Sequence, residues 1–110
     1  MNPTIAALYN SLRAQHDALS QLLDNATNPT DAQAILVEMQ EITHRMDTAQ
    51  NYMLTATAAS LAQAGAAIGQ ADASLTAVIQ GQAGVTAVVA GVTQFLGVVD
   101  QVIDLAKTLP

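Results

Sequence analysis

An apolar residue returns every three or four positions in ILVEMQEITHRMDTAQNYM, residues 35–53. Such spacing places the apolar side chains on one face of an α-helix. These side chains are Ile35, Met39, Ile42, Met46, Ala49 and Met53. Just upstream, Thr30 and Gln33 have the spacing of a capping box, in which the two side chains bond to the first free N–H groups of a helix. The sequence therefore predicts a helix that begins near residue 31.

The same apolar stripe continues beyond residue 53 after one extra step of four residues. Its further members are Thr57, Leu61, Ala64, Ile68, Ala71, Leu75 and Val78. A four-residue step shifts an apolar seam without ending the helix. We therefore expect one long central helix over residues 31–80. Gly65 and Gly69 are its weak points, because glycine costs about 1 kcal/mol relative to alanine inside a helix.

The amino-terminal segment predicts a second, shorter helix. Asn2 is a good cap, and Pro3 suits the first helical position. The apolar positions then recur at Ile5, Tyr9, Leu12, His16, Leu19 and Leu23. Proline at position 29 biases Asn28 away from helical backbone and predicts a turn. Folding back at this turn sets Ile5 opposite Met53, Leu12 opposite Met46 and Leu19 opposite Met39.

The carboxy-terminal segment predicts a third helix after a turn at Gln80-Gly81-Gln82. Its apolar seam consists of Val85, Val88, Val92, Phe95, Val99 and Val102. The valines favour a β-strand, whereas the three-to-four-residue period favours a helix, which we expect. Folding back around Gly81 sets Phe95 opposite Ala67.

Together these patterns predict a single all-α domain over residues 1–110. We expect an elongated, coiled-coil-like bundle of three helices in the order short, long, short, joined as antiparallel hairpins. A break of the long helix near Gly65 or Gly69 would give four helices. The predicted core and docking residues are Ile5, Leu12, Leu19, Met39, Met46, Met53, Val92, Phe95 and Val99.

The composition excludes several functional classes. The chain has no cysteine, which excludes disulfides, thiolate metal sites and thiol nucleophiles. Three basic residues against nine acidic ones give a net charge of −6. Nucleic-acid binding requires clustered cations that neutralise phosphates, so we expect no nucleic-acid partner. The carboxylates of Asp17, Asp24, Glu38 and Asp47 are interpreted as a solvated acidic face.

Few side chains are candidates for chemistry. Glu41 and His44 have the Glu-x-x-His spacing of di-iron bundles, but the motif occurs once and lies off the apolar stripe. His16 lies on the apolar face and is interpreted as a histidine at the edge of the core. No Ser-His-Asp set, phosphate-binding glycine loop or calcium loop is recognisable. We expect no enzyme activity, cofactor, metal or small-molecule substrate.

The location of the protein is left open by the sequence. The amino terminus lacks the basic region and apolar run of a signal peptide, which predicts a cytoplasmic protein or one exported by a signal-independent route. Residues 73–99 carry no charge, which raises the alternative of a secreted protein whose apolar carboxy-terminal half associates with membranes. Gln80, Thr86 and Thr93 interrupt this stretch.

Asn28-Pro29-Thr30-Asp31, followed by an aliphatic helix with Ala49-Gln50-Asn51, resembles the turn and second helix of type III secretion needle subunits. That resemblance implies a helical hairpin and a needle-like structural role, but the third predicted helix has no counterpart there. Our preferred hypothesis is a bacterial helical-bundle interaction or structural protein that self-associates. Small residues on the flanks of the central helix would allow close approach, namely Ala56, Ala59, Ala66 and Ala73.

Overall fold

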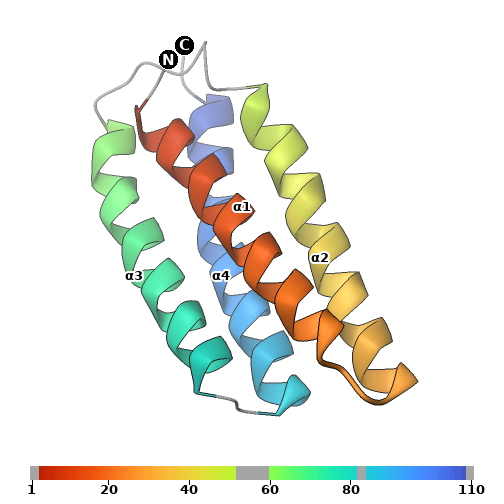
Figure 1. Ribbon diagram of the computed structural model, residues 1–110. Helices are drawn as coiled ribbons and strands as arrows, with labels where there is room; N and C mark the ends of the chain where they lie inside the picture. Colours follow the sequence, from red (N-terminus) through yellow and green to blue (C-terminus); the bar gives the residue numbers. More distant parts are fainter. Residues whose placement is uncertain (1–2, 52–59, 82–83, 109–110) are drawn as a thin grey trace.

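The computed structural model describes residues 3–51, 60–81 and 84–108. These residues form four α-helices and no strand (Figure 1). The helices are α1 (Pro3–Asp24), α2 (Pro29–Gln50), α3 (Ser60–Gln80) and α4 (Val85–Thr108). They lie side by side in an elongated bundle with principal dimensions of 47, 22 and 17 Å. The predicted all-α class is confirmed.

Three helices were predicted and four are present among the described residues. The break that was considered near Gly65 or Gly69 does not occur there. Gly65 and Gly69 both lie inside α3, whereas α2 ends at Gln50 and α3 begins at Ser60. Residue 65 lies against α1: the Cγ2 atom of Thr4 would be at an ordinary contact distance of 3.7 Å from a Cβ added to Gly65. A continuous helix over residues 31–80 would be about 75 Å long. Two shorter helices instead allow both apolar faces to share one core. Met53 and Thr57 lie outside the described residues.

The four helices form two antiparallel hairpins, α1–α2 and α3–α4. These hairpins pack against each other through α1 with α3 and through α2 with α4. In Figure 1, α2 and α3 lie on opposite sides of the bundle, and α1 and α4 occupy the front and the back. The chain runs in the same direction in α1 and α3, and in α2 and α4. Each hairpin therefore contributes one helix to each of two parallel pairs.

The turn between α1 and α2 is fixed by an asparagine cap. Asn28 has extended backbone (φ −130°, ψ 140°), and its side-chain oxygen accepts a hydrogen bond of 2.9 Å from the backbone N–H of Asp31. Pro29 is the first helical residue, a position at which its missing N–H is harmless. The predicted cap at Thr30 is therefore wrong by two residues, because the amide of Asn28 already fills that role.

The core lies along the bundle axis and receives side chains from all four helices. Of the predicted docking residues, Ile5, Leu12, Leu19, Val92, Phe95 and Val99 are buried. Met39 and Met46 are partly buried and pack against this core, and Met53 is not among the described residues. The side chain of Gln50 donates a 3.3 Å hydrogen bond to the hydroxyl of Tyr9, which places α1 and α2 close to the register that pairs Leu12 with Met46.

Candidate functional site

The first polar link between the two hairpins is centred on Gln15 of α1, whose exposed fraction is 2%. Its Nε2 donates to Asp72 Oδ1 at 2.8 Å and to Thr76 Oγ1 at 2.9 Å, and it also lies 3.2 Å from the backbone oxygen of Asp72. Its Oε1 is buried and has no hydrogen-bond partner among the described residues. Because buried polar groups are costly when unpaired, this amide fixes the register of α1 on α3.

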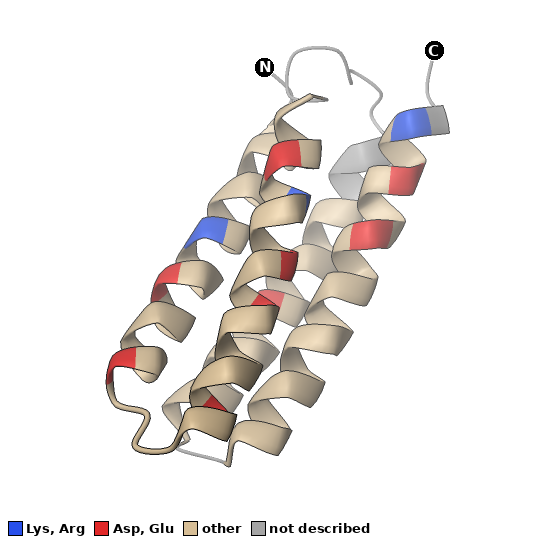
Figure 2. Cartoon of the chain, turned by 90° about the vertical axis from the view of Figure 1, so that its right-hand side faces the viewer, with Lys and Arg blue, Asp and Glu red and all other residues tan. Residues whose placement is uncertain are grey.

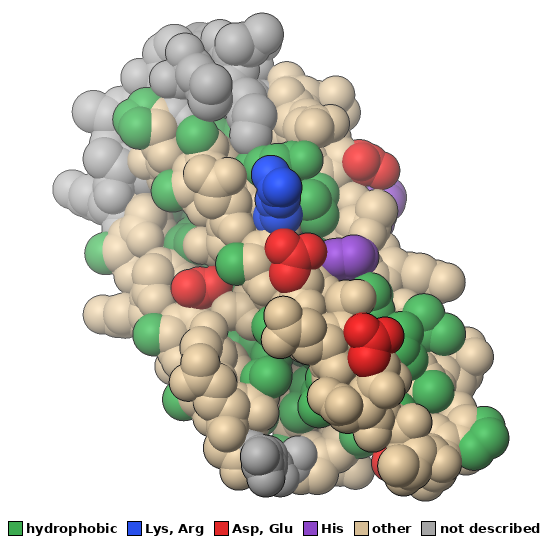
Figure 3. Space-filling model, viewed as in Figure 1, with side chains coloured by type: hydrophobic (Ala, Val, Ile, Leu, Met, Phe, Trp, Pro, Cys, Tyr) green, Lys and Arg blue, Asp and Glu red, His purple; other side chains and the backbone are tan. Residues whose placement is uncertain are grey.

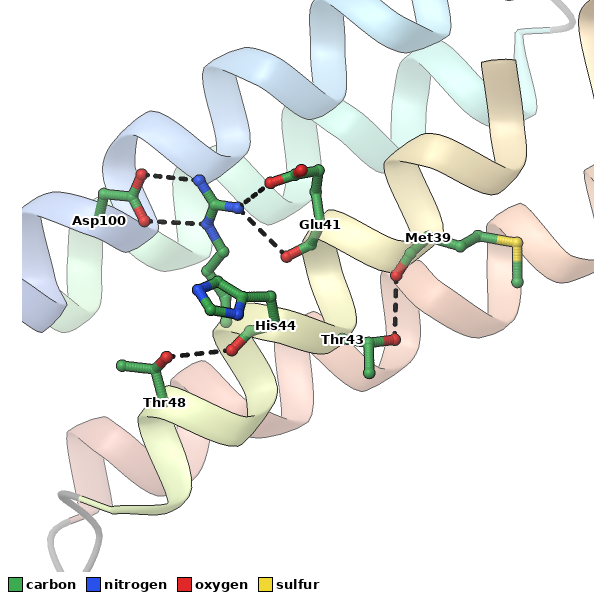
Figure 4. A network of polar contacts seen from close by, with 7 residues as sticks. Met39, Glu41, Thr43, His44, Thr48 and Asp100 are labelled. Carbon is green, nitrogen blue, oxygen red and sulfur yellow. Dashed lines mark hydrogen bonds and ion pairs between the residues drawn. The ribbon is translucent and has the colours of Figure 1, made fainter. Parts of the chain in front are cut away.

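The second polar link is centred on Arg45 of α2 and is shown in Figure 4. Its Nε and Nη2 each lie 3.1 Å from one carboxylate oxygen of Asp100 in α4, a bidentate arrangement. Its Nη1 donates to the carboxylate of Glu41, and it lies 3.4 Å from the backbone oxygen of Glu41. The hydrogen bond to Asp100 raises the pKa of Arg45, against a smaller opposing effect of burial. Arg45 thus holds α2 to α4 as a permanent cation.

A surface groove runs between α2 and α4 and is divided by this link. One hollow has a volume of about 680 Å³ and extends toward the end of α4, where Ile103, Asp104 and Lys107 line it. The other has a volume of about 490 Å³ and is lined by Val37, Glu38, Glu41, Arg45, Thr93, Leu96, Gly97 and Asp100. We call the two hollows together the α2–α4 groove. Its walls combine apolar side chains with both signs of charge.

Glu38 is the acidic residue in this groove whose environment disfavours its charge. Burial raises the pKa of its carboxyl, the neighbouring carboxylate of Glu41 raises it further, and Arg45 opposes this with a smaller effect. No ion pair joins Glu38 to a cation within the described ranges. Of the four residues interpreted as a solvated acidic face, Asp17, Asp24 and Asp47 are exposed, whereas the side chain of Glu38 is only partly exposed.

We expect the Glu38→Gln variant to be more stable than the wild type at pH 7. Because the pKa of this carboxyl is higher in the folded state than in the unfolded state, the folded state binds the proton more tightly. The stability of the fold therefore falls as the pH rises above 4.5, the ordinary pKa of a glutamate. Thermal denaturation followed by circular dichroism at pH 7 and pH 4 would measure this. The variant should have the higher Tm at pH 7 and no advantage at pH 4. Equal Tm values at pH 7 would contradict the account of Glu38.

The outward-facing side of α3 is a second notable surface. Its exposed residues are small or uncharged, and we call them the α3 outer face: Ala66, Ala67, Gly69, Gln70, Ala73, Ser74, Ala77 and Gln80. Asp72, the charged residue of α3, binds Gln15. At the left of Figure 3, where α3 lies, apolar and uncharged polar atoms make up most of the visible surface. This face is compatible with close approach of another helix.

The charged side chains are unevenly distributed. Figure 2 shows the acidic residues spread over several helices and the basic residues set apart from one another. Arg13, Arg45 and Lys107 lie on three different helices and form no basic patch. In the described part of the chain, no group of three metal-binding side chains comes together. Glu41, from the Glu-x-x-His spacing, binds Arg45, and His44 is exposed beside it at the groove.

One segment among the described helices, Val85–Lys107 of α4, is long and apolar enough to cross a membrane, with a mean hydropathy of 1.5. Length and composition alone support this, and the core helix of a soluble bundle can share both properties. In the bundle, α4 turns Val88, Val92, Phe95 and Val99 toward the core.

Comparisons with known proteins give no assignment: no protein-family model matches the chain, and no curated protein or solved structure is significantly similar to it.

Gln15, Arg45 and Asp100, the polar residues that join the hairpins, were not singled out from the sequence. For Gln15, however, the apolar spacing of α1 already indicated a buried position. Leu8, Leu12, Gln15 and Leu19 follow a four–three–four spacing, which places Gln15 on the buried seam. We assigned that position to His16, whose side chain is instead about one-third exposed and lies 3.9 Å from Asp17. Arg45 and Asp100 are 55 positions apart, and no local pattern links them.

Proposed function

We propose that this chain is a non-catalytic helical-bundle protein that acts through contacts of its helix faces and self-associates through the α3 outer face. The observation that carries the proposal is an exposed, uncharged helix face on a chain with a net charge of −6. Ala66 and Ala73, two of the residues for which the sequence predicts close approach, lie on this face.

The distribution of charge supports a second copy as the partner. Six of the nine acidic residues lie on the α1–α2 hairpin, and Asp72 is the single acidic residue of α3. Two copies that meet through α3 keep their acidic hairpins apart, which limits like-charge repulsion. Small side chains also reduce the distance at which two helix axes can pack. A two-fold dimer would pair the α3 outer face with itself.

We expect the wild-type protein to self-associate and the Ala73→Glu variant to do so at least about tenfold more weakly. At a two-fold interface, the substitution places two like charges close together in a face that is otherwise neutral. Sedimentation velocity over a range of protein concentrations would measure the association. Ala14→Glu, which adds the same charge to an exposed position of α1, is the matched control and should associate like the wild type.

A wild-type protein that remains monomeric at the highest concentration would contradict self-association. Equal weakening by Ala14→Glu and Ala73→Glu would show that total charge matters and the α3 outer face does not.

Membrane association is the second candidate function, and the length and hydropathy of α4 favour it. A spanning helix needs about 20 largely apolar residues. Because the apolar residues of α4 face the core, association would require the bundle to open. Flotation with neutral and anionic vesicles would test this: protein that rises with the lipid supports it, and protein that stays in the dense fraction with both lipids contradicts it.

A further inference from the structure

Packing within the described chain does not explain why residue 97 is a glycine. Gly97 lies in the interior of α4 and lines the α2–α4 groove. A Cβ added at this position would meet nothing within 4 Å, whereas one at Gly91 would lie 3.1 Å from Cδ1 of Leu75. Glycine is less favourable than alanine inside a helix, so Gly97 lowers the stability of the fold with no internal contact that requires it.

Glu38 lowers the stability of the same part of the molecule for a different reason. Its carboxylate is partly buried, lies near that of Glu41, and makes no ion pair with a described cation. Arg45, the cation whose charge acts on Glu38, is already bound by Glu41 and Asp100. Two independent features that are unfavourable in the free chain therefore line one hollow of the groove.

The remaining walls of this hollow are suited to an apolar contact. Val37 is one of two large apolar side chains exposed among the described residues, at 42%. Leu96, a largely buried residue of the opposite helix, also lines the hollow. Grooves between two helices commonly bind an amphipathic helix whose apolar face lies in the groove.

Charge indicates which helix would fit. Four acidic side chains line the groove, namely Glu38, Glu41, Asp100 and Asp104, against the two cations Arg45 and Lys107. A helix with lysine or arginine beside its apolar face would supply the missing partner of Glu38. No described helix of a second copy would supply that charge, because each of the four carries more acidic than basic residues.

We infer that the α2–α4 groove is the docking site for a basic amphipathic helix of a different protein. The backbone of that helix would approach Gly97, its apolar side chains would contact Val37 and Leu96, and a basic side chain would pair with Glu38. This interaction uses a different surface from the α3 outer face and does not depend on self-association.

The test uses a synthetic helical peptide with leucines at three- and four-residue spacing, flanking lysines and one tryptophan. The chain contains no tryptophan, so the emission of the peptide reports binding without background. We expect the full-length wild-type protein to bind this peptide and to bind poorly a version in which glutamate replaces every lysine. Binding should weaken as salt is added, because the contact is partly ionic.

Gly97→Ala separates docking from folding. We expect this variant to bind the lysine peptide at least about tenfold more weakly, because the new methyl group occupies the space for the partner backbone. The same variant should have a Tm higher by about 2–6 °C, because alanine is the better helix former. Gly69→Ala is the matched control: a Cβ there also meets nothing within 4 Å, but it lies on α3. It should raise the Tm and leave peptide binding unchanged.

Glu38→Gln provides a second variant, which should weaken binding of the lysine peptide about tenfold and reduce its salt dependence. Three results would overturn the inference: no binding of the lysine peptide by the wild type, equal binding of the two peptides, or equal binding by Gly97→Ala and Gly69→Ala. A fourth result would also overturn it: self-association that is lost in Gly97→Ala and kept in Ala73→Glu. The groove would then bind a second copy of this chain and not a helix of a different protein.

Discussion

Phe95→Ala should lower the free energy of unfolding by about 3–5 kcal/mol, the range for removal of a buried aromatic ring. Phe95 is the largest of the fully buried side chains, with an exposed fraction of 1%. Ala67 and Ala71 of α3 lie near it, and these small side chains cannot move to fill the space that the ring leaves. The cost therefore includes the cavity as well as the lost burial.

Chemical denaturation followed by circular dichroism would measure the loss. Domains of this size are stable by about 5–15 kcal/mol, so the variant should unfold at a much lower denaturant concentration. Phe95→Leu is the control that keeps most of the apolar volume, and we expect it to lose clearly less stability. A loss below about 1 kcal/mol for Phe95→Ala would mean that the ring does not occupy the core as described.

Gln15→Glu should cost about 3 kcal/mol or more at neutral pH, although it changes little in size or shape. It replaces a buried donor with a carboxylate that faces Asp72 Oδ1, the atom that now lies 2.8 Å from Nε2. A buried charge beside a like charge has neither solvent nor a counter-ion to stabilise it. Denaturation curves at pH 7 and pH 4 would measure the cost, which should shrink at pH 4 as carboxyl groups become protonated.

Gln15→Met is the matched control for this prediction, because it keeps the length of the side chain and removes the donor without adding charge. We expect it to cost about 1–2 kcal/mol, the range for a lost hydrogen bond in a partly buried site. If the glutamate and methionine variants were equally stable at pH 7, Gln15 and Asp72 would not be in contact in solution.

The sequence predicted which segments are helical much better than it predicted where the second and third helices separate. Apolar periodicity located α1, the first part of the central segment and α4, because each of these helices buries a single continuous face. The same stripe runs from residue 35 to residue 78 with one extra four-residue step, and such a step normally shifts the apolar seam without ending the helix, so the pattern predicted one helix. The separation depends on the packing of α1 against α3 and of α2 against α4, which are contacts between distant parts of the chain.

The candidate site was harder to predict than the fold. Gln15 was accessible to sequence reasoning, because it lies on the seam with Leu12 and Leu19. The α2–α4 groove was not, since it depends on Val37 and Glu38 facing Leu96 and Gly97, residues of a helix far along the chain. Gly97 was not singled out from the sequence. The local pattern does not show whether a glycine inside a helix has a close neighbour, as Gly91 has, or open space beside it, as Gly97 has.

The way the helices pair also bears on how the chain reaches this fold. Each hairpin forms from segments that are adjacent in sequence, whereas the contact of Gln15 with Asp72 spans 57 positions and that of Arg45 with Asp100 spans 55. Contacts between nearby segments form faster than those that close long loops, so the hairpins should form first and dock late. Gln15 and Arg45 would then act after the main folding barrier, slowing the separation of the hairpins and contributing little to the rate at which each one forms.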